Sequence, residues 1–206
     1  MLLLATALTA AAYDRNASRR IFEVYPTEDV RDGHSAAVEY DLLVDPDGKL
    51  VRCTALRAVG DPNLASKVCA LIQLARVGFT RATAPEGTPA YGVIHSTNKY
   101  FLPSTPQGDQ IRDFTFGPEA EAYVTALPAG LEDPVTVKVV TFIGQDGKTA
   151  ACEPGRDART DLAAAACGVV ASQEWNKVAD ATGTPISYVR EIEVQFRVDR
   201  RPAAGS

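Results

Sequence analysis

Residues 42–53, LLVDPDGKLVRC, decide the fold of this chain, because a similar stretch, TFIGQDGKTAAC, follows at residues 141–152. Each stretch runs from apolar residues through Asp-Gly-Lys to a cysteine, and Asp47 and Asp146 lie 99 positions apart. Self-similarity at one spacing indicates an internal repeat. The sequence therefore predicts two copies of one structural unit. The alternative is a chance match in a chain rich in Ala, Gly and Asp.

The residues around each Asp-Gly pair predict a β-hairpin. Before the first turn, apolar residues alternate with polar ones, which is typical of a strand with one face toward a core, at Val38, Tyr40, Leu42 and Val44. Asp-Gly then supplies the positive φ angles of a tight turn. A second strand is expected over residues 49–56 in the first copy and 148–153 in the second.

A helix and a closing strand complete each unit. Asp61 followed by Pro62 is typical of an N-cap and a first helical position. Apolar residues then recur at helical spacing, at Leu64, Val68, Leu71 and Ile72, and again at Leu162, Ala166, Val169 and Val170. Gly-Thr-Pro loops lead to closing strands over residues 91–102 and 188–198. We therefore predict an α+β fold of two tandem ββαβ modules, each a small antiparallel sheet packed on one helix.

The repeats set the expected domain boundaries. They are 36–103 for repeat 1, 104–133 for a linker rich in Pro and Gly with a short helix near 119–127, and 134–199 for repeat 2. The apolar run 1–12 predicts a signal-like segment, although no Lys or Arg precedes Arg15. It is too short to span a bilayer. The alternative is a buried N-terminal segment.

Four cysteines occupy matching places in the two units, one on the second strand and one on the helix. A helix packed on its own hairpin brings these positions together, so we predict the disulfides Cys53–Cys69 and Cys152–Cys167 among three connectivities. Such bonds persist in oxidising compartments. Free buried cysteines are an alternative, and a zinc site is disfavoured because no CxxC spacing or nearby histidine pair occurs.

These units resemble the C-terminal domain of TonB, in a tandem variant with paired cysteines. The resemblance rests on the turn sequences, the aromatic residue after each helix and the Gly-x-Pro loops: Val44 to Leu50, Phe79, Gly87-Thr88-Pro89, Gln145 to Lys148, Trp175 and Gly183-Thr184-Pro185. It covers residues 36–103 and 134–199. It implies a periplasmic protein in TonB-dependent transport that grips an extended segment of an outer-membrane receptor.

We expect peptide capture by strand addition rather than energy transduction, because this sequence shows neither a membrane anchor nor a Pro-rich spacer. The unpaired N–H and C=O groups of a sheet edge provide the affinity in this mode. The closing strands are the expected edge, with candidate residues Val93, His95, Thr97, Val189, Glu191 and Glu193. The alternative is a structural or assembly protein whose repeats pair with each other or form a homodimer.

The composition argues against several other functions. A net charge of -5 disfavours nucleic-acid binding, which needs a surplus of Lys and Arg. His34 and His95 lie in no catalytic motif, and a hydrogen-bonded or solvent-facing role is expected for both. No phosphate-binding or nucleophile motif occurs. We therefore expect no enzyme activity, cofactor or metal, with an uncharacterised hydrolase as the weaker alternative.

Overall fold

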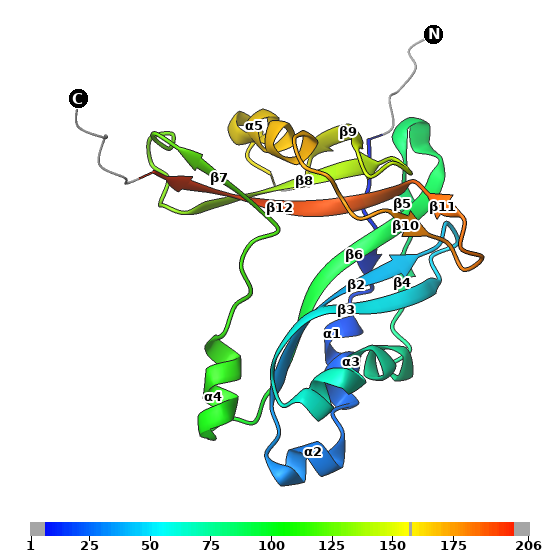
Figure 1. Cartoon of the computed structure of the whole chain (residues 1–206), viewed down its shortest axis with the longest axis vertical. Coiled ribbons are helices and arrows are strands. Elements are labelled where there is room, and N and C mark those ends of the chain that lie inside the picture. The colour runs from blue at the N-terminus through cyan, green and yellow to red at the C-terminus, as the bar shows by residue number, and fades with distance from the viewer. Residues whose placement is uncertain (1–6, 157, 200–206) are drawn as a thin grey trace.

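The computed structural model of the protein describes residues 7–156 and 158–199 and shows an α+β fold (Figure 1). The first half of the chain comprises, in order, β1 (Ala12–Tyr13), α1 (Ala17–Glu23), α2 (Thr27–Asp32), β2 (Ala36–Val44), β3 (Leu50–Gly60), α3 (Pro62–Leu74), β4 (Phe79–Thr80), β5 (Ala82–Thr83), a 3-10 turn (Pro85–Gly87) and β6 (Pro89–Tyr100).

A connecting segment contains α4 (Pro106–Asp113) and β7 (Ala120–Val124). The second half comprises β8 (Val135–Ile143), β9 (Thr149–Pro154), α5 (Thr160–Ala171), β10 (Val178–Ala179), β11 (Pro185–Ile186) and β12 (Tyr188–Val198). Each half therefore keeps the predicted hairpin, helix and closing strand. The Asp-Gly turns form as expected, since Gly48 and Gly147 both have φ of +83°.

The two halves share one sheet (Figure 1), which corrects the prediction of two separate small sheets. Among the described residues, eight strands form it, in the order β3-β2-β6-β12-β8-β9, with β5 beside β6 and β7 beside β12. The halves join where β6 and β12 run parallel through three residue pairs, Tyr91 to Val93 with Tyr188 to Arg190. Sequence patterns predict each unit's own pairings but not this contact between units.

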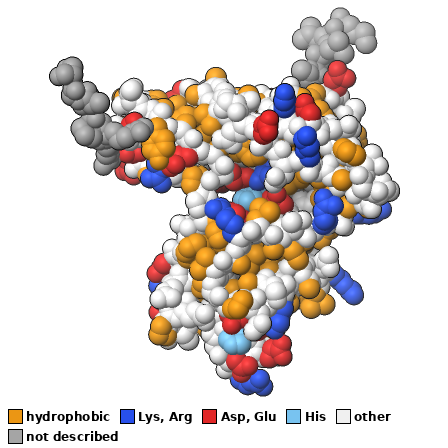
Figure 2. Space-filling model, viewed as in Figure 1, with side chains coloured by type: hydrophobic (Ala, Val, Ile, Leu, Met, Phe, Trp, Pro, Cys, Tyr) orange, Lys and Arg blue, Asp and Glu red, His pale blue; other side chains and the backbone are white. Residues whose placement is uncertain are grey.

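The helices cover opposite faces of this shared sheet. Leu42 packs with α3 in one core, whereas its neighbour Leu43 belongs to the other core, with α5. In β12, Val189 belongs to the core with α3, and its neighbour Tyr188 belongs to the core with α5. Because adjacent strand residues point to opposite faces, α3 and α5 lie on opposite sides. The molecular surface is indented where the halves meet (Figure 2).

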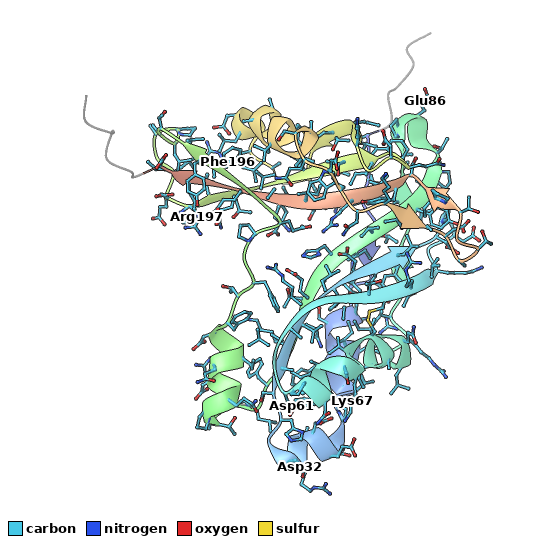
Figure 3. The ribbon with its side chains drawn as sticks, viewed as in Figure 1. Asp32, Asp61, Lys67, Glu86, Phe196 and Arg197 are labelled. Carbon is cyan, nitrogen blue, oxygen red and sulfur yellow. A yellow bond between two sulfur atoms is a disulfide. The ribbon has the colours of Figure 1, made fainter. Side chains whose placement is uncertain are left out.

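The connecting segment is more structured than the linker predicted for residues 104–133. The helix expected near 119–127 is wrong, because Ala120–Val124 form β7, which pairs in parallel with β12 from Val194 to Val198. Figure 3 shows Phe196 and Arg197 at this end of β12, beside β7. Hydrogen bonding to the open side of β12 stabilises the extended conformation of Ala120–Val124, and this outweighs their local preference for a helix.

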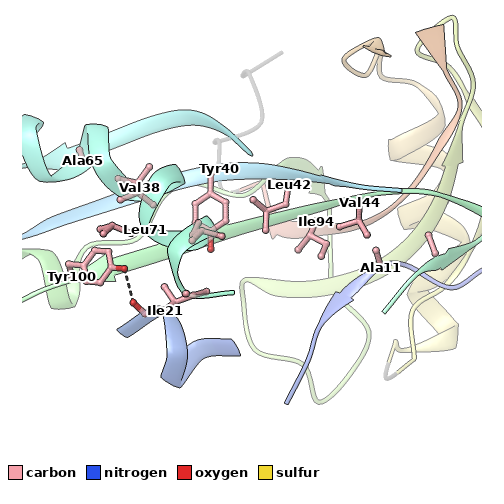
Figure 4. Close-up of a cluster of buried hydrophobic side chains, with 14 of the residues drawn as sticks. Ala11, Ile21, Val38, Tyr40, Leu42, Val44, Ala65, Leu71, Ile94 and Tyr100 are labelled. Atoms are coloured by element: carbon pink, nitrogen blue, oxygen red, sulfur yellow. Dashed lines mark hydrogen bonds between the residues drawn. The ribbon is translucent and has the colours of Figure 1, made fainter. Parts of the chain in front are cut away.

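The core of the first half lies between α3, α1 and the sheet (Figure 4). Asp61 caps α3 as predicted, accepting a hydrogen bond from the Leu64 N–H at 2.8 Å. Buried Tyr100 donates to the Ile21 carbonyl at 2.7 Å, which ties α1 to β6. The helical residues that face the sheet are those predicted from their spacing: Leu64, Val68, Leu71 and Ile72.

Both predicted disulfides are confirmed. Cys53 is bonded to Cys69 with their Cα atoms 5.5 Å apart, and Cys152 is bonded to Cys167 with 5.7 Å. Each bond links the second strand of a hairpin to the helix that packs on it. Two disulfides fit an oxidising compartment outside the cytoplasm. None of the helices in the described part of the chain has the length and apolar character of a membrane span.

The end of the predicted signal-like segment, 1–12, is part of the fold. Residues 1–6 lie outside the described residues, but Leu8 and Ala11 are buried in the first core. The Leu8 N–H also donates to Glu153 of β9 at 2.9 Å, so this segment contacts both halves. A cleavage at Ala12 would therefore remove Leu8 and Ala11 from this core.

Gly92 on β6 gives a test of this packing. A Cβ atom at Gly92 would lie 2.5 Å from the Ala11 Cβ and 3.0 Å from the Ala82 Cβ. We expect Gly92→Ala to lower the free energy of unfolding by about 1–3 kcal/mol through this steric conflict, measured by urea denaturation. The double variant Ala11→Gly/Gly92→Ala should recover part of the loss. Equal stability of Gly92→Ala and the unmodified protein would show that residue 11 does not pack there.

Candidate functional site

The strand β3 provides the longer free edge of the sheet. In the described part of the chain it pairs only with β2, and residues 54–60 are all exposed. Leu56 and Val59 are exposed apolar side chains on it, at 41% and 38%. Figure 2 shows hydrophobic side chains gathered over β3 and α3. An unpaired, partly apolar strand of this length is a template for pairing with another chain.

The surroundings leave most of β3 exposed, although Phe116 and Gly117 of the connecting segment contact the Arg57 side chain. Near its start, Arg52 donates to the Ala179 carbonyl at 3.2 Å, so the β10–β11 hairpin lies beside it. Near its end, α4 packs against β2 and β3. One register irregularity occurs opposite Glu39 and Tyr40, which leaves Leu56 as the extra residue. The other strands with one partner are shorter: β9 has six residues and is partly buried, β7 has five and β5 has two.

The predicted binding edge on the closing strands is interrupted, because β6 pairs with β12 over Tyr91–Val93 and β12 pairs with β7 over Val194–Val198. Beyond Val93, β6 has β2 as its one strand partner in the described part of the chain. Val93 and Val189 lie within the β6–β12 pairing. Glu191 and Glu193 form ion pairs with Lys138 of β8, at 3.2 and 3.0 Å. Thr97 is exposed and pairs in register with Glu39, and His95 lies in a charged cluster. These residues therefore do not form one binding surface.

A cluster of charged side chains lies where β6 and β12 diverge. We call it the junction cluster: Glu39, Asp41, Arg57, His95, Glu119 and Arg190. The His95 Nδ1 atom is 2.8 Å from Asp41 Oδ1 and 4.0 Å from Glu119 Oε1, and its Nε2 is 3.3 Å from Glu39 Oε1. Three carboxylates therefore surround one imidazole, from β2 and from the segment before β7.

Two arginines complete the junction cluster. Arg190 of β12, with its side chain 6% exposed, hydrogen-bonds Glu119, and its Nη1 is 3.6 Å from Asp41 Oδ2. Its guanidinium lies over the Trp175 ring at 5.6 Å. Arg57 of β3 binds Glu39 through two nitrogens, at 2.5 and 2.6 Å. The contacts therefore run from the free edge strand to the second half.

Burial and neighbouring charges shift the proton affinities in this cluster. Burial raises the pKa of Glu119 above its usual value, although Arg190 and His95 oppose this. Burial disfavours charged His95, but the hydrogen bond to Asp41 and the charge of Glu119 outweigh it and raise its pKa. Burial also opposes ionisation of Glu39, but the hydrogen bond from Arg57 and the charge of His95 lower its pKa.

A second polar cluster links α2 to α3. The candidate ligand atoms of Asp29, His34 and Asp61 lie within 4.8 Å of one another. However, the Lys67 ammonium is 2.9 Å from Asp29 Oδ2, and His34 Nδ1 is 2.9 Å from Asp29 Oδ1. Figure 3 shows Asp61 and Lys67 at the end of the first half away from α5. His34 and Lys67 therefore each contact one carboxylate oxygen of buried Asp29, and the cluster is a structural ion-pair network.

The junction cluster was missed from sequence, although its signal is present. Glu39 and Asp41 alternate with apolar residues in β2, a pattern that predicts a solvated outer face. That face is instead partly covered by residues from β12 and the connecting segment. His95 was correctly expected to be hydrogen-bonded or exposed. Its partners come from distant parts of the chain, which a local pattern does not reveal.

The chain matches no protein-family model, no curated protein and no solved structure.

Proposed function

We propose that this protein is a non-enzymatic binding module of an oxidising compartment that captures an extended segment of another protein by strand addition to β3. The observation that carries the proposal is the free edge of β3, with exposed residues 54–60 and no strand partner other than β2 in the described chain. Strand addition obtains affinity from main-chain hydrogen bonds and selectivity from alternate side chains.

The side chains of β3 support a binding role over a passive edge. Natural sheet edges are commonly protected by Lys, Pro or short length. From Leu50 to Gly60, eleven residues long, β3 contains neither Lys nor Pro, and it exposes Leu56 and Val59. Two register irregularities, at Val51 and Leu56, interrupt its pairing with β2, and Arg57 to Gly60 pair regularly beyond them.

The proposal keeps the resemblance to the TonB C-terminal domain and changes the strand that binds. The order of strand, strand, helix and strand in each half, with its disulfide, supports this resemblance. Under it, the compartment is the periplasm and the partner is an extended segment such as one of an outer-membrane receptor. The binding strand is then β3 rather than the closing strands, because the open side of β6 and β12 is interrupted by their mutual pairing and by β7, whereas β3 has one open side along its whole length.

Titration with a panel of extended ten-residue peptides, followed by amide NMR, tests the proposal. We expect saturable shifts concentrated at residues 54–59, and loss of binding when alternate backbone nitrogens of a binding peptide are methylated. The proposal would be overturned if no peptide of the panel caused saturable shifts, or if the shifts were confined to other elements. A mass that rises with protein concentration in light scattering, without peptide binding, would favour self-association instead.

Leu56→Lys is a sharper test of the binding strand. A lysine on an edge disfavours pairing with an incoming strand, so we expect at least about tenfold weaker peptide binding, or about 1.4 kcal/mol. Leu74→Lys is the matched control, because Leu74 is also exposed but lies on α3. Isothermal titration measures both. Equal weakening by the two substitutions would contradict binding at β3.

A further inference from the structure

The surface around β3 is basic, although the protein as a whole is acidic. Residues 48–85 contain six of the chain's 21 Lys and Arg residues but only one of its 26 Asp and Glu residues, Asp61. They include β3 and α3, which pack against each other. Figure 2 shows Lys and Arg side chains at the margin of the hydrophobic side chains over β3 and α3. The charge of this surface is therefore complementary to an acidic partner.

Half of these six cations are available to a ligand. Lys49, Arg57 and Lys67 already form ion pairs with carboxylates of the first half. Exposed cations without an ion pair in the described part of the chain are Arg52, Arg76 and Arg81. Arg52 donates to the neutral Ala179 carbonyl at 3.2 Å, a contact that does not neutralise its charge.

The two faces of a strand added to β3 would each meet one of these free cations. Arg52 pairs in register with Leu43, which belongs to the core with α5, so the Arg52 side chain lies on the face away from α3. Arg76 lies on the opposite face, because it lines a cavity together with Ile72 of the core with α3. Acidic residues at either set of alternate positions in the added strand can therefore meet a cation.

The cavity beside Arg76 lies where the added strand would end. It has a volume of about 430 Å³ and opens between the β2–β3 turn and the end of α3. Its lining includes the cations Lys49 and Arg76 and the apolar side chains of Leu50 and Phe79. Leu50 is the first residue of β3, so a segment paired along β3 would reach the cavity with one end. The cavity therefore offers a positively charged place to an acidic residue at that end.

The backbone at Arg76 favours a residue other than arginine. Arg76 directly follows Ala75, the C-cap of α3, and has a φ of +49°. Glycine is the usual residue at this position after a helix, because a side chain is crowded in the left-handed conformation. Strained residues of this kind cluster at binding sites. A role for the guanidinium at the cavity accounts for an arginine at this place.

We propose that the segment captured at β3 is acidic, with carboxylates that meet Arg52 beside the strand and Arg76 at the cavity. The inference rests on the proposed capture at β3 and adds the chemistry of the partner. Nucleic acids and polyphosphates are also negatively charged, but they lack the peptide N–H and C=O groups that pair with a strand edge. The partner is therefore a protein segment.

Three capped ten-residue peptides test the charge preference. They alternate Thr with Glu, Gln or Lys, so that length and backbone are the same. An exposed ion pair strengthens binding by up to about fivefold, so we expect the Glu peptide to bind roughly tenfold more tightly than the Gln peptide, and the Lys peptide to bind most weakly. Raising the salt concentration from about 50 mM to about 500 mM should remove most of this difference. Isothermal titration measures the affinities.

Arg76→Gly separates the charge of this residue from its structural role. Glycine is favoured at positive φ, so the unfolding free energy should stay unchanged or rise. The preference for the Glu peptide over the Gln peptide should nevertheless fall by about two- to fivefold, because one cation is lost. Arg76→Lys keeps the charge and should keep the preference. Arg159→Gln is the matched control, since it removes an exposed arginine beside α5 in the other half and should also keep the preference.

The outcomes distinguish this inference from capture at β3 itself. Equal binding of the Glu and Gln peptides, with amide shifts at residues 54–59, would overturn the acidic preference and leave strand capture intact. If the Glu peptide fails to bind, the inference is wrong, and if the wider panel of peptides also fails, capture at β3 is wrong with it. Equal loss of preference in Arg76→Gly and Arg159→Gln would show that overall charge, rather than the cavity, sets the preference. Inorganic polyphosphate that binds as tightly as the Glu peptide and displaces it would overturn the assignment to a protein segment.

Discussion

Replacing Arg190 by methionine is expected to lower the free energy of unfolding by about 3–5 kcal/mol, the largest single effect we predict. Arg190 hydrogen-bonds Glu119, and its Nη1 is 3.6 Å from Asp41 Oδ2. Methionine fills much of the same volume but leaves both carboxylates without this cation. The cost arises because a nearly buried charge that loses its partner is not resolvated by water. Urea denaturation at neutral pH measures the change.

Arg159→Met is the matched control for Arg190→Met. Arg159 pairs with Asp161 at 2.8 Å, but both side chains are largely exposed, so no measurable change is expected. The double variant Arg190→Met/Glu119→Gln should recover part of the loss, because it removes one of the two carboxylates that lost this cation. A loss in Arg190→Met no larger than in the control would mean that the junction contributes little to stability.

Removing the first disulfide, in Cys53→Ala/Cys69→Ala, is expected to cost about 3 kcal/mol of unfolding free energy. The bond links residues 16 positions apart and restricts the unfolded chain accordingly. It also attaches α3 directly to β3, the proposed binding strand. Denaturation of the oxidised proteins, with mass mapping to verify the remaining bond, measures the loss.

The second disulfide provides the comparison, because Cys152 and Cys167 are 15 positions apart and should contribute a similar amount. The unmodified protein with both bonds reduced should be less stable than either double variant. A loss below about 1 kcal/mol for Cys53→Ala/Cys69→Ala would contradict the loop-entropy argument for this bond.

Sequence reasoning succeeded for features that neighbouring residues control. Asp-Gly turns need only local backbone freedom, and Asp61 caps α3 through a residue three positions on. The disulfides were predictable because a helix that packs on its own hairpin brings its cysteine close to the cysteine of the second strand, as for Cys69 and Cys53. The β-β-α-β order of each half was predictable for the same reason.

Binding residues were harder to predict because an edge is a property of the whole sheet. The pattern of β12 marks a strand, but whether that strand has one neighbour or two depends on β6, from the other half. This contact and the pairing of β7 with β12 interrupt the expected edge and leave β3 as the longest one among the described strands. Ala120 to Val124 are a strand rather than the expected helix because they pair with β12.

By itself, the sequence determined the repeated unit, its turns, helices and disulfides, because each depends on side chains and backbone angles within a short segment. Only the tertiary structure decided which strands stay unpaired and which charges meet. Parallel pairing of β6 with β12 places Arg190 beside Asp41, 149 positions away, and encloses His95 between them and Glu119. Such contacts depend on long-range packing energies that no local pattern encodes.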